Sequence, residues 1–70
     1  TFLEEQKQWR LDHSRTQGVP AYVVFTDATL IAIAEQLPDN AEALSAIPGV
    51  GPAKIESYGD EVVQMVRSRA

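Results

Sequence analysis

Residues 47–55 form the stretch whose residue types and spacing best suit the binding of an anion. Pro48 ends a helix, because its ring removes a backbone N–H and clashes with the preceding turn. Gly49 and Gly51 permit backbone angles that a side chain would forbid. Pro52 suits the first position of a following helix, where a missing N–H costs nothing. The sequence therefore predicts a sharp glycine turn between two helices.

Such a turn can present backbone N–H groups and a cation to a phosphate. The candidate donors are the amides of Gly49, Val50 and Gly51 and the ammonium group of Lys54 in the following helix. The stretch lacks the glycine spacing and the preceding strand of a nucleotide-binding P-loop. The structural alternative is that the glycines only allow two helices to approach closely.

Three more basic residues, Lys7, Arg10 and Arg15, lie on a helix predicted over residues 2–17. We expect them to form one edge of a nucleic-acid patch. The alternative is a solvated face with ion pairs at i,i+3 and i,i+4 spacing. The acidic partners for such pairs are Glu4, Glu5 and Asp12.

Tyr22 follows the proline corner at Pro20 and is a further candidate for binding. An exposed tyrosine can stack on an unpaired base. The alternative is a ring packed on the protein surface with its hydroxyl in water.

The overall charge limits any binding of nucleic acid. Ten acidic and six basic residues give a net charge of −4 and an isoelectric point near 4.7. Phosphate contacts dominate the affinity of nucleic-acid binders, which usually carry a basic excess. We therefore expect a local patch and weak binding.

The residues that could support catalysis or bind a metal are few. His13 is the single histidine and cysteine is absent, so no metal-ligand set is readable. No serine has a histidine and carboxylate at a recognisable spacing. We expect no catalytic residue, metal or cofactor in this segment, no membrane span, and a monomer in a reducing cytoplasm.

The pattern of apolar residues and helix-ending residues predicts an all-α fold, a compact bundle of about five short helices with the glycine hairpin between two of them. The expected helices cover residues 2–17, 27–37, 41–46, 52–58 and 61–69, with Gly59 stopping one helix and Asp60 capping the next. Residues 21–25 resemble a strand, but a single strand has no partner. We expect a buried crossing segment there, with one turn of 3₁₀ helix. The expected core residues are Val23, Val24, Phe25, Leu30, Ile31, Ile33, Ala34, Leu37, Leu44, Ile47, Val62, Val63 and Val66.

Three stretches, residues 19–30, 47–54 and 58–59, together resemble the HRDC domain, the "helicase and RNase D C-terminal" module. The resemblance covers nearly the whole chain. The Trp9-Arg10 pair and the Pro20-Ala21-Tyr22 sequence are most similar to HRDC domains of UvrD-like superfamily I helicases, with RecQ-type helicases next.

This resemblance implies a five-helix bundle, spanning residues 1–70 as one domain of a larger chain, with an auxiliary nucleic-acid-binding role. The parent would be a bacterial ATP-dependent 3′–5′ DNA helicase of repair or recombination, with ATP and Mg²⁺ in its motor domains. The partner would be single-stranded or structured DNA. Carried onto this sequence, the DNA-binding positions are Lys7, Arg10, Arg15, Tyr22, Lys54 and the hairpin amides. Two alternatives stay open: a docking module that contacts the helicase core or another protein, and a domain of an RNase D-type exoribonuclease.

Overall fold

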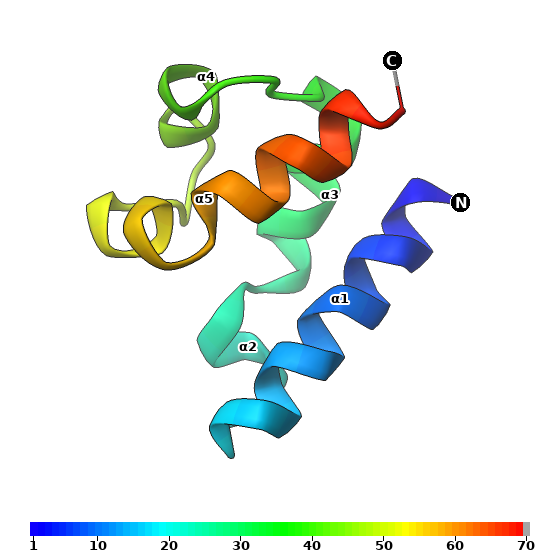
Figure 1. The fold of residues 1–70 in the computed structure, drawn as a ribbon, viewed down its shortest axis with the longest axis vertical. Helices are drawn as coiled ribbons and strands as arrows, with labels where there is room; N and C mark the ends of the chain where they lie inside the picture. The colour runs from blue at the N-terminus through cyan, green and yellow to red at the C-terminus, as the bar shows by residue number, and fades with distance from the viewer. Residues whose placement is uncertain (70) are drawn as a thin grey trace.

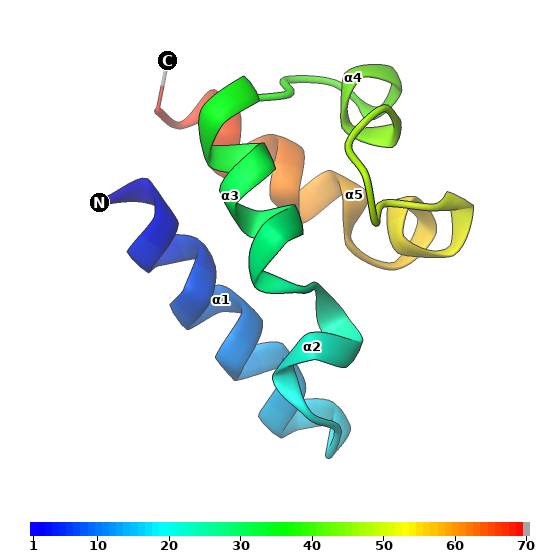
Figure 2. The same ribbon diagram turned by 180° about the vertical axis from the view of Figure 1, so that it is seen from behind.

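The computed structural model describes residues 1–69 and confirms the predicted all-α fold. Within these residues the helices are α1 (Phe2–Gln17), α2 (Ala21–Val24), α3 (Asp27–Gln36), α4 (Ala41–Ser45) and α5 (Pro52–Arg67). Figures 1 and 2 show α3 packed beside α1 and crossing behind α5 in the first view, with α4 beside α5 on the side away from α1. None of the helices described is long and apolar enough to cross a bilayer.

Short polar side chains and glycine set the helix ends, as the sequence predicts. The hydroxyl of Thr26 accepts a hydrogen bond from the Thr29 amide at the start of α3. Asn40 caps α4 in the same way. Gly18 ends α1 with φ +69°, in the left-handed region that glycine occupies at little cost. These caps satisfy backbone groups that a helix end leaves without partners.

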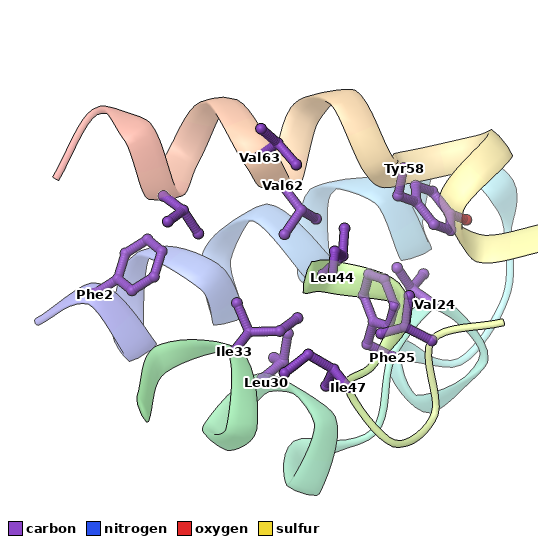
Figure 3. Packing of buried hydrophobic residues seen from close by; sticks show 12 residues of the cluster. Phe2, Val24, Phe25, Leu30, Ile33, Leu44, Ile47, Tyr58, Val62 and Val63 are labelled. Carbon is purple, nitrogen blue, oxygen red and sulfur yellow. The ribbon is translucent and has the colours of Figure 1, made fainter. Parts of the chain in front are cut away.

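The core is a single cluster contributed by all five helices and their connections (Figure 3). Its buried members are Phe2, Val24, Phe25, Leu30, Ile33, Leu44, Ile47, Val50, Tyr58, Val62, Val63 and Val66. Figure 3 shows Phe2 at one end of the cluster and Phe25 with Tyr58 at the other. Most of the expected core is thereby confirmed.

Three expected core residues lie at the surface instead. Val23 is 41% exposed, Ile31 44% and Leu37 47%. Only Val24 of α2 is buried, because a single helical turn can direct few side chains inward. Leu37 lies just past the last turn of α3, where φ +47° carries it off the buried face. Its backbone is in a region that a non-glycine residue occupies only at a cost.

The prediction of a helix break at Gly59 is wrong, because α5 continues from Pro52 to Arg67 through that residue. Gly59 is buried, and a Cβ there would lie 3.3 Å from Cγ2 of Ile55. An interior glycine costs a helix only about 1 kcal/mol relative to alanine. Burial of Tyr58 and Val62 on either side of it outweighs that cost.

Polar side chains connect α1 to α5 along an antiparallel seam. Residue numbers rise along α1 as they fall along α5 and the residues just after it. The three contacts are Glu5 Oε2–Arg69 Nη1 at 3.7 Å, His13 Nε2–Glu61 Oε2 at 2.8 Å and Gln17 Nε2–Tyr58 Oη at 2.6 Å. The start of α1 and the end of α5 therefore lie together at one end of the molecule (Figure 1).

Candidate nucleic-acid interface

The segment that joins α2 to α3, residues 23–29, connects the elements that carry the candidate binding residues. We call it the α2–α3 junction. Three hydrogen bonds connect it to other helices and loops. Lys54 Nζ donates to the carbonyl of Val23, and Arg10 Nη1 donates to the carbonyl of Phe25 at 3.0 Å. From the junction itself, Thr29 Oγ1 donates to the carbonyl of Pro48 at 2.9 Å. The junction thus fixes the start of α5 and the glycine hairpin, residues 48–52, relative to α2.

The hairpin position that requires glycine is Gly49 rather than Gly51. Gly49 has φ +91°, and a Cβ there would lie 2.3 Å from Oγ1 of Thr29. Gly51 has φ −98° and ψ −180°, which is extended backbone, and a Cβ there would meet nothing within 4 Å. Of the two glycines predicted to permit angles that a side chain would forbid, only Gly49 adopts such an angle, and Gly51 does not.

Of the three hairpin amides proposed as donors, one is engaged within the turn. The N–H of Val50 donates to the carbonyl of Ile47 at 3.1 Å, and the Val50 side chain is buried. The N–H groups of Gly49 and Gly51 donate to no acceptor within residues 1–69. The first turn of α5 also has no side-chain cap. Two hairpin amides and the positive end of a 16-residue helix dipole therefore remain available to an anion.

Lys54 is half-buried and holds α5 against α2. Its ammonium group donates to the carbonyl of Val23 and lies 5.8 Å from the ring centroid of Phe25 and 5.7 Å from that of Tyr58. Cations are attracted to aromatic faces at such distances. An ammonium group has three N–H donors, so two remain for a ligand beside the hairpin.

Tyr22 is 69% exposed and immediately precedes the residue that Lys54 contacts. The fold therefore brings Tyr22, Lys54 and the glycine hairpin to the same region, although they are about thirty residues apart in the sequence. The tyrosine ring has the exposure that stacking on a base requires.

Arg10 is placed inside the structure rather than at a binding surface. Its side chain is only 13% exposed, and Nη1 lies 2.7 Å from Oδ1 of Asp27. The hydrogen bond and the positive charge of Arg10 hold the pKa of Asp27 below its ordinary value of 3.8. Arg10 thus joins α1 to the α2–α3 junction, and a phosphate would have to displace Asp27 to reach it.

Lys7 and Arg15 are exposed on α1, as a binding role requires. Neither forms an ion pair or a side-chain hydrogen bond within residues 1–69. Eight positions separate them, about 12 Å along a helix axis, so they contribute two separate charges.

Sequence reasoning missed the structural roles of Thr29, Arg10 and Lys54. Thr29 is 3% exposed and contacts the hairpin 19 residues away. The partners of all three residues include backbone carbonyls distant in sequence, which no local pattern reveals. No group of three residues with metal-binding side chains is found within residues 1–69.

The sequence and the fold of this chain are similar to those of known proteins. The model of the HRDC domain family matches residues 2–66. The ATP-dependent DNA helicase UvrD2 of Mycobacterium tuberculosis H37Rv is 60% identical over 68 residues, which are 97% of this chain and 10% of that protein. The ATP-dependent DNA helicase RecQ of Bacillus subtilis is 36% identical over 69 residues, which are 99% of this chain and 12% of that protein.

Among solved structures, the third HRDC domain of RecQ from D. radiodurans superposes with a TM-score of 0.89 at 33% identity. The alignment covers 96% of this chain and 88% of that one. The chain therefore matches most of a solved domain, while it spans only about a tenth of the length of the curated helicases.

Proposed function

This chain belongs to the HRDC domain family, and on that premise we propose that it is an auxiliary nucleic-acid-binding module of an ATP-dependent DNA helicase. In this role it helps the helicase engage single-stranded or structured DNA and performs no chemistry itself. ATP and Mg²⁺ would act in motor domains outside these 70 residues.

The observation that carries the proposal is the meeting of three binding elements beside the α2–α3 junction. The hairpin offers two amides with no acceptor in residues 1–69, Lys54 offers two ammonium protons, and Tyr22 offers an exposed ring. Amides and a cation suit one phosphate, and a ring suits the base next to it. Together these groups suit the binding of a single strand, whose phosphates and unpaired bases are both accessible.

The affinity should be weak and strongly dependent on salt. The net charge of −4 opposes the approach of DNA, and few cations face the ligand. The titration therefore belongs at low ionic strength, with a labelled single strand and a labelled forked duplex as the two ligands.

Fluorescence anisotropy of the labelled DNA tests the proposal. We expect saturable binding that Tyr22→Ala weakens by about 5- to 100-fold, the loss of one stacked base. Ile31→Ala is the matched control, because Ile31 is an exposed apolar side chain on α3. Absence of saturable binding at millimolar protein, or equal effects of the two substitutions, would contradict the proposal.

Gly51→Ser gives a second test, because it should raise the stability of the fold and weaken the binding of DNA. The extended backbone of Gly51 accepts a side chain, and serine would supply the cap that α5 lacks. We expect stabilisation by roughly a few tenths of a kcal/mol. The same hydroxyl would occupy an amide of the first turn, so phosphate binding should weaken. Stabilisation with unchanged DNA affinity would mean that the first turn of α5 does not contact DNA.

The distribution of charge favours a second candidate, a docking module. Four of the six basic side chains already have acceptors inside the chain. These are Arg10 with Asp27, Lys54 with the Val23 carbonyl, Arg67 with the Asp39 carbonyl, and Arg69 with Glu5. The remaining surface is largely acidic and suits a protein partner or the helicase core. A ¹⁵N chemical-shift map recorded with the motor domains added would test docking, and an unchanged spectrum would exclude it.

The relatives named above are helicases rather than nucleases, which favours a helicase parent over an RNase D-type exoribonuclease. A 3′–5′ polarity, a role in DNA repair or recombination, a monomeric state and a bacterial cytoplasmic location remain part of the same proposal. Sequence upstream of residue 1 would distinguish the two parents, because helicase and nuclease motifs differ.

A further inference from the structure

Thr29 contacts the glycine hairpin from the first turn of α3 and is 3% exposed. Its Oγ1 lies 2.9 Å from the carbonyl oxygen of Pro48 and 3.0 Å from Oγ1 of Thr26. Its backbone N–H also donates to Oγ1 of Thr26. A buried hydroxyl with two such contacts, on a residue whose amide makes a third, holds its neighbours in one arrangement.

The direction of each hydrogen bond follows from the donors present. The carbonyl of Pro48 can only accept, so the hydroxyl proton of Thr29 goes to it. The contact between the two threonine hydroxyls must then use the proton of Thr26. Thr26 thereby orients the Thr29 hydroxyl, and the Thr29 hydroxyl fixes the Pro48 carbonyl.

Fixing this carbonyl also fixes the next amide. The peptide bond between Pro48 and Gly49 is planar and trans, so its N–H points opposite to its C=O. The carbonyl points to the buried side chain of Thr29. The Gly49 N–H must therefore point away from α3, and it meets no acceptor within residues 1–69.

We infer that Thr29 is the positioning residue of the hairpin, which aims the Gly49 N–H at a phosphate oxygen of the bound strand. The inference rests on the proposed function for its ligand. Thr29 does not touch the phosphate and acts through the Pro48–Gly49 peptide plane. This arrangement also requires glycine at position 49, because any Cβ there would lie 2.3 Å from the Thr29 hydroxyl oxygen.

The closing experiment separates positioning from binding. Thr29→Val removes the hydroxyl at nearly constant shape, and Thr29→Ser keeps it. Thr16→Val is the matched control, because the Thr16 hydroxyl donates to a backbone carbonyl on exposed α1. For the free proteins, the readouts are the Pro48 carbonyl ¹³C shift and the Gly49 amide ¹⁵N shift. Both should move in Thr29→Val and stay near the wild-type values in the other two variants.

Binding is then measured with an oligo-dT single strand at low salt. We expect Thr29→Val to bind at least about fivefold more weakly, with Thr29→Ser and Thr16→Val within about twofold of wild type. Unmoved Pro48 and Gly49 shifts in Thr29→Val would overturn the positioning role. Moved shifts with unchanged affinity would also overturn it, because Gly49 would then be aimed at nothing.

The test stays informative if wild type does not bind or if Thr29→Val does not fold. If wild type does not bind oligo-dT, the proposed function fails, while the shifts still report whether Thr29 sets the peptide plane. If Thr29→Val does not fold, Thr29→Ala removes the same hydroxyl without adding a methyl group at its position.

The wild-type chain also offers a check, since exchange of the Thr29 hydroxyl proton for deuterium should shift the Pro48 carbonyl signal. Absence of that isotope shift would count against the hydrogen bond.

Discussion

Replacing Gly49 with alanine should destabilise the fold far more than the same change at Gly51. Alanine at φ +91° costs about 1–2 kcal/mol, because its Cβ crowds the backbone. The Cβ would also lie 2.3 Å from Oγ1 of Thr29, so that hydroxyl must move away. The carbonyl of Pro48 then loses the hydrogen bond that it accepts from this hydroxyl, which costs about 0.5–1.5 kcal/mol more. The expected loss for Gly49→Ala is about 1.5–3.5 kcal/mol.

Gly51→Ala is the matched control. Its backbone is extended and its Cβ would have no neighbour within 4 Å. Alanine is a poorer N-cap than glycine, which destabilises the fold, but it makes the unfolded chain less flexible, which stabilises the fold. We therefore expect the free energy of unfolding to change by less than about 1 kcal/mol. Urea unfolding followed by far-ultraviolet circular dichroism measures both variants. Equal losses, or a larger loss at Gly51, would refute the assignment of the constraint to Gly49.

Three further substitutions test other parts of the fold. Trp9→Ala should cost about 3 kcal/mol in urea unfolding, because the indole packs on the rings of Phe25 and Tyr58 and is partly exposed; a loss below about 1 kcal/mol would contradict this packing. Asp27 has a pKa below 3.8 in the folded chain, so its pairing with Arg10 stabilises the fold above that pH and is lost as the pH falls through the folded pKa. Asp27→Asn should therefore flatten the pH dependence of stability below about 3.8, and an unchanged acid limb would argue against the pairing. Leu37→Gly should stabilise by about 0.5–1 kcal/mol, because it relieves a left-handed backbone at a half-exposed position; destabilisation would show that the leucine side chain contributes more than its backbone costs.

Local chemistry explains which parts of the fold can be predicted from the sequence. Caps such as Thr26 and Asn40 act within three residues, so their role is visible in the sequence. The inward positions of α3 and α5 follow the helical period. Gly59 shows the limit of such reasoning, because its local preference for a helix end is outweighed by burial along the whole of α5.

The candidate site was harder to predict, because its geometry depends on contacts across the fold. The sequence pointed to the hairpin and to Tyr22, and the structure places them near one another. Which of the two glycines leaves no room for a side chain depends on Thr29. The availability of Arg10 and Lys54 depends on carbonyls 15 and 31 residues away. The number of basic residues in the sequence is therefore larger than the number of cations that are free to contact a ligand.

The position of the single tryptophan has a practical consequence for the seam between α1 and α5. Trp9 lies on α1, with its ring centroid 4.6 Å from that of His13 and 5.5 Å from that of Tyr58 on α5. Separation of these two helices would remove Tyr58 from the indole and admit water. The wavelength of maximum tryptophan fluorescence in the unlabelled protein therefore reports whether the first and last helices are in contact.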